Sequence, residues 1–590
     1  MPALRTYDVF ALSGRSVTRC AQTARALWSP PMTITGVWVG LLLCGGVPDA
    51  AVAPTRFSTA AVVSQSRIAS RVGAEILEHG GNAVDAAVAT AFALAVTHPS
   101  AGNIGGGGFA VVFQPDRPAT TFDFREKAPS ASRSDMFLGK DGAYDPNRHH
   151  WSHLSVGVPG TVAGLHALHR RLGHVPWRRL VDPAVRLARK GFPVSAGLAT
   201  SLEAMIPVFR RHPATLAQFT RDGQPLRQGD RLAQPALADT LALIRDLGRD
   251  GFYLGRTAKL IVEEMQRGGG VITLDDLRAY EPVEREPVRG TYRGYDIISI
   301  PPPSSGGVAL VEMLNILDGV DLASLGLRSA AETHWLIEAM RRAYADRARY
   351  LGDTDFVTVP VDRLMSAAYA AELRRTIRPD RASTSDRRRF DWPHESDETT
   401  HLCVVDRHRM AVSLTTTLEQ SYGSRIIVPG AGFLLNNEMG DFNPKAGMTT
   451  DGGLIGTSPN LVAPGKRMLS SMTPTIVTRD GRPVLIIGSP GGRTIINTVL
   501  EVIVNFVDHG MPIQGAIDLP RFHHQWLPDT VVAERSCFSP DTRSLLEALG
   551  HKIRIRRGTQ GSAMGIAILP GGDIEAGVDR RLPDGGAAGY

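Results

Sequence analysis

The spacing of hydrophobic residues predicts helices in the first two thirds of the chain. Between Ser64 and Val96, apolar side chains recur every three or four residues, with an interruption at Gly80-Gly81. This is the period of an amphipathic helix, and paired glycines break it. The same period returns in the stretch from Val162 to Ile377, most clearly over 236–247, 257–267 and 331–350. We therefore expect two N-terminal helices followed by a helix-rich middle.

Short hydrophobic runs bounded by glycine and aspartate predict strands. We expect these strands at 109–113, 295–300, 402–405, 410–417, 475–478 and 484–487, with a helix over 494–507 after the last one. The alternation from Phe122 to Glu126 places Arg125 where a strand meets a loop. Periodicity alone thus predicts an α+β chain.

Two glycine-rich or proline-rich stretches have structural explanations. Gly105 to Gly108 lack the Lys-Ser/Thr of a phosphate loop and run into a strand, so we expect their backbone to pass close to another segment. Residues 301–307, which read Pro-Pro-Pro-Ser-Ser-Gly-Gly, predict a rigid loop between a strand and a helix. We interpret both stretches as structural.

The segment from Pro379 to Glu398 differs from the rest of the chain. It carries many charges and almost no aliphatic residues, which predicts a mobile, exposed segment. It ends at Thr399-Thr400, where an apolar strand begins. A threonine is a poor nucleophile unless a base lies beside it, and the α-amine of an N-terminal threonine is such a base. Either threonine can have this role only after the chain is cleaved.

Composition and charge narrow the classes of function. The chain has 590 residues, 43% of them hydrophobic and 21% charged, as in globular proteins with room for two or more domain-sized units. The net charge of +6 is spread along the sequence. Its one dense basic cluster, Arg387 to Arg389, has no interleaved aromatic residues, so we expect no nucleic-acid partner.

The first 53 residues have the order of a secretory signal. Arg15, Arg19 and Arg25 precede an apolar run over 33–47, and small residues ending Ala51-Val52-Ala53 follow it. The run is too short to span a bilayer comfortably. We expect a signal region at 1–53 and a periplasmic or secreted protein, with an uncleaved anchor as the alternative.

Removal of that region leaves two cysteines. Cys403 falls within a predicted strand and Cys537 lies far from it, so we expect no disulfide framework, while a pairing of the two stays open. No histidines and cysteines stand at the spacing of zinc ligands. We expect no catalytic metal and no cofactor.

Several spaced motifs, taken in order, resemble the γ-glutamyltranspeptidase family. The likeness runs from about Thr59 to Tyr590, and an ordered set is far more specific than any one motif. The motifs are Thr399-Thr400-His401 and the stretches 80–87, 105–109, 123–126, 415–420, 435–442, 469–474, 488–492 and 520–526.

The resemblance implies a fold and a subunit organisation. The fold is a four-layer αββα sandwich of the N-terminal nucleophile hydrolase type, built jointly by a large subunit (54–398) and a small subunit (399–590). Thr399, two residues before His401, matches the nucleophile, and cleavage after Glu398 would make it an N-terminus. The mature protein would then be a heterodimer of its own two fragments.

The resemblance also implies roles for ten residues. Thr417 matches a threonine that hydrogen-bonds the nucleophile Thr399, and Gly491 and Gly492 match the oxyanion hole. The residues that match the substrate-binding positions are Arg125, Ser470 and Ser471 for the α-carboxylate and Glu419, Glu438 and Asp441 for the α-ammonium. Two departures stand out: some members carry Asn at the position of Glu419, and an aromatic lid residue is replaced near Gly452. The loop 443–467 is nevertheless long enough to act as a lid.

The implied function is an exported, self-cleaving γ-glutamyl hydrolase and transferase acting on glutathione and related γ-glutamyl amides, with water, amino acids or peptides as acceptors. Two alternatives share the fold: a glutaryl- or cephalosporin-type acylase and a poly-γ-glutamate hydrolase. A third, a non-catalytic binding protein, conflicts with the intact Thr399, Thr417, Gly491 and Gly492.

Overall fold

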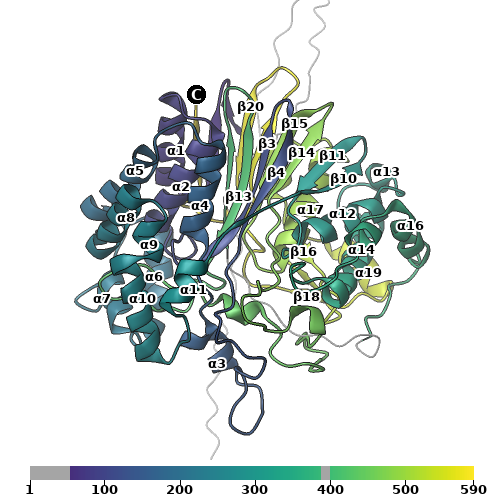
Figure 1. Ribbon diagram of the computed structural model, residues 1–590. Coiled ribbons are helices and arrows are strands. Elements are labelled where there is room, and N and C mark those ends of the chain that lie inside the picture. Colours follow the sequence, from purple (N-terminus) through teal and green to yellow (C-terminus); the bar gives the residue numbers. More distant parts are fainter. Residues whose placement is uncertain (1–52, 387–398) are drawn as a thin grey trace, which may run out of the picture. The chain divides into compact units, whose positions relative to one another are not determined.

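The computed structural model describes residues 53–386 and 399–590. Two seven-stranded antiparallel sheets form its centre, and helices cover the outer face of each sheet (Figure 1). This is the predicted α+β fold, a four-layer αββα sandwich. The first sheet has the order β21 (Gly586–Gly589), β2 (Ala61–Ser64), β12 (Thr400–Val405), β13 (Ala411–Thr417), β3 (Gly107–Gln114), β4 (Arg117–Phe124) and β9 (Val283–Arg285).

The second sheet is antiparallel in the same way. Its order is β1 (Thr55–Phe57), β20 (Ile574–Val578), β19 (Met564–Ile568), β15 (Arg482–Gly488), β14 (Thr475–Arg479), β11 (Tyr295–Ser299) and β10 (Val288–Tyr292). A small third sheet joins β16 (Phe522–His523), β17 (Val531–Ala533) and β18 (Ile553–Ile555). Two-stranded pairs join β5 (Phe192–Pro193) to β8 (Arg231–Leu232) and β6 (Thr220–Arg221) to β7 (Gln224–Pro225).

Each sheet is covered by its own group of helices. Those packed in one core with the first sheet are α1 (Arg67–Glu78), α2 (Ala83–Thr97), α4 (Thr161–Leu172), α5 (Trp177–Lys190), α6 (Ala196–Phe209), α8 (Pro235–Leu247), α9 (Asp250–Tyr253), α10 (Gly255–Gly268) and α11 (Leu274–Ala279). Those packed with the second sheet include α12 (Gly306–Leu317), α13 (Leu322–Leu325), α14 (Ala330–Tyr350), α16 (Ala367–Arg375), α17 (Thr494–Val507), α18 (Ile513–Asp518) and α19 (Pro540–Ala548). The remaining helices are α3 (Pro146–His150), α7 (Pro213–Phe219) and α15 (Val361–Leu364).

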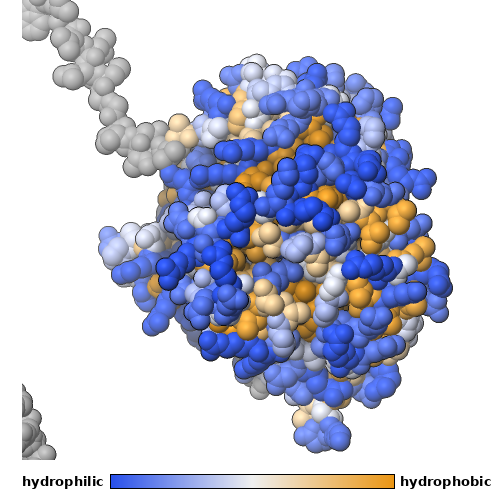
Figure 2. All heavy atoms as spheres, turned by 90° about the vertical axis from the view of Figure 1, so that its left-hand side faces the viewer, coloured by the Kyte–Doolittle hydropathy of each residue, from blue (hydrophilic) through white to orange (hydrophobic). Residues whose placement is uncertain are grey.

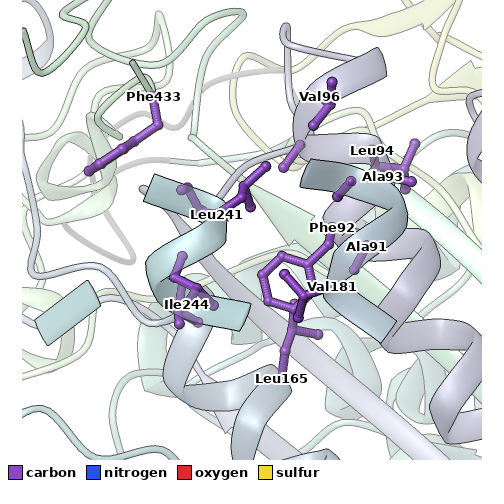
Figure 3. Close-up of a cluster of buried hydrophobic side chains, with 14 of the residues drawn as sticks. Ala91, Phe92, Ala93, Leu94, Val96, Leu165, Val181, Leu241, Ile244 and Phe433 are labelled. Atoms are coloured by element: carbon purple, nitrogen blue, oxygen red, sulfur yellow. The ribbon is translucent and has the colours of Figure 1, made fainter. Parts of the chain in front are cut away.

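The central strands of the first sheet are buried on both faces, because alternate side chains enter different cores. In β3, Ala110 and Val112 pack with the helices, whereas Phe109 and Val111 pack between the two sheets. In the helical core, Phe92 of α2 lies close to Val181 of α5 and Leu165 of α4 (Figure 3). The outer surface of this helical layer is mostly hydrophilic, with hydrophobic residues gathered in a few places (Figure 2).

The helices and strands that periodicity predicted are confirmed to within a few residues. The interruption at Gly80-Gly81 separates α1 from α2, because Asn82 caps α2 through a capping box with Asp85. The helix predicted over 494–507 coincides with α17. Both sheets contain strands from before and from after the 398/399 boundary, hydrogen-bonded to one another, so the two stretches form one core.

The glycines at 105–108 confirm the predicted close approach of backbone. A Cβ atom added at Gly106 would lie 2.0 Å from the carbonyl oxygen of Thr417, and one at Gly108 would lie 2.2 Å from that of Thr415. Both distances are far below van der Waals contact. Any larger residue here would push β13 away from β3.

The charged segment that precedes Thr399 is only partly as expected. Ser383 and Ser385 donate their backbone N–H groups to Glu338 and Asp529, at 3.0 Å each. Residues 379–386 are therefore anchored and not mobile, because their polar backbone finds buried acceptors. Residues 387–398, and residues 1–52 of the predicted signal region (1–53), lie outside the described residues. Among residues 53–386 and 399–590, no helix is long and apolar enough to cross a membrane.

Candidate active site

Thr399 and Thr417 lie at the same end of neighbouring strands. In the β12–β13 register Thr400 pairs with Thr416, so continuing it by one residue sets Thr399 opposite Thr417. Both threonines are buried and line one pocket. The hydroxyl oxygen of Thr417 accepts a hydrogen bond of 2.8 Å from the backbone N–H of Glu419, which fixes its direction.

His401 follows Thr399 by two residues but is engaged elsewhere. Its Nδ1 lies 2.8 Å from the hydroxyl of Thr415, and its Nε2 lies 3.2 Å from the sulfur of Cys403. Burial lowers the pKa of His401 to about 3, so the ring is neutral. Because both ring nitrogens have partners, this histidine is poorly placed to act as the base for Thr399.

Gly491 and Gly492 form the turn between β15 and α17. Their φ angles are +131° and +52°, a region that favours glycine. A Cβ atom on Gly491 would lie 2.6 Å from the hydroxyl of Thr494. Backbone N–H groups at such a turn, next to a helix N-terminus, suit a developing negative charge.

A small pocket gathers most of the predicted site residues. It encloses about 260 Å³ of empty space, and the ten residues that line it are Arg125, Thr399, Thr417, Glu419, Asp441, Ser470, Ser471, Met472, Gly492 and Ile495. Gly491 lines a neighbouring cavity, which Thr399 also lines. Glu438 does not line the pocket and lies fully buried behind it.

Arg125 follows the last residue of β4 and is almost fully buried, as the strand-to-loop prediction required. Its guanidinium lies 2.5 Å from the carboxylate of Glu438 and also contacts Asp441. It donates to the carbonyl oxygens of Met468 and Leu469 as well, at 3.3 Å each. Arg125 is therefore paired with two of the three acids that the resemblance assigned to the ammonium group.

Glu126 is a buried acid that the sequence interpretation did not single out. It is fully buried, with its carboxylate 3.6 Å from the guanidinium of Arg125. Burial raises the pKa of both Glu126 and Glu438 to about 8, although Arg125 opposes this shift. Both groups thus hold a proton readily near neutral pH. The one sequence signal for Glu126 was its place beside Arg125 in the 123–126 motif.

Glu419 is held at the pocket by a strained backbone. Its φ is +78°, rare for a residue with a side chain and common at functional sites. Its carboxylate accepts a hydrogen bond from the side chain of Asn437 and lies 3.8 Å from Nδ1 of His150. Burial lowers the pKa of His150 to about 4, so this histidine is neutral and leaves the negative charge of Glu419 in place.

Ser470 and Ser471 are positioned by a loop and a second buried arginine. The backbone of Ser470 bonds to Pro303 at 3.0 Å and Ser305 at 2.8 Å, which confirms a structural role for the 301–307 loop. Arg347 of α14 donates to the hydroxyl of Ser471 at 3.0 Å and to that of Ser305 at 2.8 Å. Sequence interpretation missed Arg347, since only the tertiary fold brings α14 to this loop.

The loop over 443–467 is folded against itself. Asn443 and Asn460 join its two ends through a backbone hydrogen bond of 2.8 Å. Gly452, near which the resemblance implies a replaced aromatic lid residue, is exposed and lines a large cleft together with Leu454.

One group of potential metal ligands occurs among the described residues. His334, Glu338 and His551 offer ligand atoms within 4.8 Å of one another. Nδ1 of His334 and Nε2 of His551 already lie 2.8 Å apart, and Glu338 pairs with Arg341 and Arg342. Two guanidinium groups beside the carboxylate oppose a cation, so we interpret the group as structural. Cys403 and Cys537 are free and buried, which closes the question of their pairing.

Comparisons with known proteins show the family of the chain. The chain is 44% identical over 590 residues to the glutathione hydrolase proenzyme of Escherichia coli (strain K12), covering 100% of this chain and 99% of the relative. It is 46% identical over 508 residues to the glutathione hydrolase proenzyme of Pseudomonas sp. (strain A14), covering 86% and 88% of the two chains. Its structure is similar to that of the cephalosporin acylase from Bacillus halodurans, with a TM-score of 0.81 and 27% identity over 91% of this chain and 97% of that one. The model of the gamma-glutamyltranspeptidase family matches residues 69–590. With the site residues gathered in one pocket and most of the chain matched, the chain belongs to the γ-glutamyltranspeptidase family.

Proposed function

We propose that this chain is a self-cleaving γ-glutamyl hydrolase and transferase that uses Thr399 as its nucleophile. Its substrates are glutathione and related γ-glutamyl amides, and its acceptors are water, amino acids or peptides. The observation that carries the proposal is the small pocket in which Thr399 and Thr417 lie beside Arg125, Asp441 and the two serines. A nucleophile, a cation and hydroxyl donors within one pocket suit an α-amino acid with a reactive side-chain amide.

The first step of the proposal is processing of the precursor. The hydroxyl oxygen of Thr399 attacks the carbonyl carbon of Glu398, the C–N bond breaks, and an ester forms while the nitrogen takes up the proton. Water then hydrolyses the ester. The products are a large subunit (54–398) that ends in a carboxylate and a small subunit (399–590) whose first residue carries a free α-amine.

That amine is the base for turnover. It takes the hydroxyl proton of Thr399 while the oxygen attacks the γ-carbonyl of the donor. The N–H groups of the glycine turn at 491–492 stabilise the oxyanion of the tetrahedral intermediate. The protonated amine then gives its proton to the leaving nitrogen, and a threonine ester remains. Water or an acceptor amine resolves this ester by the same route in reverse.

The recognition of the donor follows from the charges around the pocket. Arg125, Ser470 and Ser471 would bind the α-carboxylate, because a guanidinium fork and two hydroxyl donors match its oxygens. Glu419 and Asp441, which line the pocket, would bind the α-ammonium. Glu438 lies behind Arg125, so we propose that it acts on the ammonium through the position of that arginine.

Export belongs to the proposal as well. Residues 1–53 would direct the chain to the periplasm or outside the cell and then be removed. The support is the order of basic, apolar and small residues at the N-terminus.

The decisive experiment is intact mass measurement with N-terminal sequencing of the purified protein. We expect two fragments, the smaller beginning at Thr399, and a single uncleaved chain for Thr399→Ala. Thr400→Ala is the matched control and should still be cleaved, because its hydroxyl is not the proposed nucleophile. An active wild-type protein that remains one chain would refute the mechanism.

A glutaryl- or cephalosporin-type acylase is the second candidate, favoured by the structural similarity to the acylase from Bacillus halodurans. A glutaryl donor lacks the α-amine, so binding it would leave Glu419 and Asp441 without their cation. Stranding one partner of a buried ion pair costs about 3–5 kcal/mol. We expect kcat/KM for γ-glutamyl-p-nitroanilide to exceed that for glutaryl-p-nitroanilide at least tens of times, in line with that cost. Equal values would favour the acylase.

A further inference from the structure

A large cleft beside the proposed nucleophile is lined by arginines. Its volume is about 1160 Å³, slightly above the usual range of small-molecule sites. Helix α3, the 443–467 loop and the segments around β16 and β18 contribute its walls, in the lower part of Figure 1. Its described lining residues include no aspartate or glutamate, and they include four arginines: Arg493, Arg554, Arg556 and Arg557. We call it the basic cleft.

Three of these arginines have no compensating acid within the described ranges. Arg554, Arg556 and Arg557 take part in no ion pair there, and Arg554 and Arg557 are exposed while Arg556 is half-buried. The buried His523 lines the same cleft, and burial lowers its pKa to about 3, with a smaller contribution from Arg493 and Arg556. The histidine is therefore neutral, and the charged residues in the described lining of the cleft are all positive. Such a cleft concentrates anions.

The basic cleft is continuous with the site of reaction. It shares Thr494 and Arg556 with the cavity that Thr399 and Gly491 line. On its other side, His150 of the cleft lies 3.8 Å from the carboxylate of Glu419. The cleft therefore borders the donor pocket on the side of the oxyanion turn and on the side of the ammonium site.

The orientation of the bound donor determines which part of the donor reaches the basic cleft. Its amino-acid end lies among Arg125, Ser470 and Ser471, and its carbonyl lies at Thr399 and the glycine turn. The leaving amide must then point out of the small pocket, toward the cavities that Thr399 borders. A peptide leaving group extends about 3.3–3.6 Å per residue. The carboxylates of a leaving group that is one or two residues long therefore extend from Thr399 toward the arginines of the basic cleft.

On the basis of the proposed function, we propose that the basic cleft binds the leaving group of the donor and favours leaving groups with two or more carboxylates. The chemistry at Thr399 is unchanged, since the cleft acts on the departing amine side of the scissile bond. A donor with a neutral leaving group, such as a p-nitroanilide, makes no use of the arginines.

The test compares two nearly isosteric dipeptide donors, γ-glutamyl-glutamate and γ-glutamyl-glutamine, on the processed protein. Their leaving groups differ by one carboxylate, so the ratio of their kcat/KM values measures recognition of that charge. We expect the glutamate donor to be favoured about 2- to 30-fold at low salt, the range that two partly exposed ion pairs supply. The ratio should fall as sodium chloride is raised, because salt screens exposed charges.

The double variant Arg556→Gln/Arg557→Gln should bring this ratio close to one. The matched control, Arg289→Gln/Arg482→Gln, removes two exposed arginines on β10 and β15 that do not line the cleft, and should leave the ratio unchanged. A wild-type ratio of one or less, or a ratio that survives in the double variant, would overturn the proposal. Turnover of γ-glutamyl-p-nitroanilide distinguishes failure of this inference from failure of the proposed function. If the wild type turns over this donor but shows either of the two contrary ratios, only the inference about the basic cleft is refuted. If the wild type does not turn over this donor, the proposed function itself is refuted.

Discussion

Replacing Arg125 by alanine separates substrate binding from structural support at the centre of the site. The guanidinium is buried against Glu438 and Asp441, so a substrate carboxylate must displace one of these partners. Substrate binding thus exchanges one ion-pair partner of Arg125 for another and adds no new ion pair. We therefore use the value for a hydrogen bond to a charged group, about 1.5–3 kcal/mol, and expect a loss of about 10- to 150-fold in kcat/KM.

The same substitution affects stability. It leaves three acids around an empty position, but Glu126 and Glu438 have pKa values raised to about 8 and take up protons near neutral pH. Asp441 is partly exposed at the pocket. The cost should therefore lie near the lower end of the range for a stranded buried charge, about 3 kcal/mol. The variant should still fold and be cleaved, with a lower Tm.

The assay uses γ-glutamyl-p-nitroanilide and 4-aminobutyryl-p-nitroanilide, which lacks the α-carboxylate. We expect Arg125→Ala to lose activity toward the first donor through KM and to change little toward the second, so that the preference between them collapses. Arg125→Lys keeps the charge without the fork and should lie between the two proteins. An equal loss for both donors would refute the clamp and leave Arg125 a structural residue.

Three further predictions follow from the site and the core. Gly492→Ala keeps the backbone N–H but puts a side chain at φ +52° in the oxyanion turn; we expect the strained turn to shift its N–H donors away from the oxyanion, and misplacing one donor should lower kcat by up to about 10²- to 10³-fold; Gly481→Ala, at φ +70° in an open turn, is the control and should leave kcat unchanged. His401 (folded pKa about 3, ordinary value 6.5) stays neutral in the folded protein and protonates on unfolding, so its contribution to stability is lost as the pH falls from 6.5 to 3; the paired Glu338 (folded pKa about 2, ordinary value 4.5) adds a further loss below pH 4.5, the raised pKa values of other buried acids oppose the loss above that pH, and a Tm that is the same at pH 3 as at pH 4.5 would contradict this. In protein lacking residues 1–53, a thiol reagent should find no reactive cysteine in the native state and two after denaturation, since Cys403 and Cys537 are buried and free.

The sequence by itself determined the helices, the strands and the family. Local periodicity is enough for elements such as α17, because an amphipathic helix or a buried strand needs a repeating pattern that neighbouring residues carry. The ordered motifs were enough to single out Thr399, Thr417 and the glycine turn, because such a chemistry needs particular residue types at particular backbone positions. Even the glycines at 105–108 could be interpreted correctly from their lack of side chains.

The tertiary structure alone decided the partners of the buried charges. Arg125 meets Glu438 and Asp441 only because β4 ends beside the loop that follows β13, more than 300 residues later in the chain. The support of Ser471 by Arg347 and the gathering of arginines in the basic cleft arise in the same way. The physical reason is that the pairing and protonation of a charged group depend on the groups around it in the folded protein. Periodicity reports which side of an element is buried, whereas the pKa and the partner of a buried acid depend on segments that folding brings together from distant parts of the sequence.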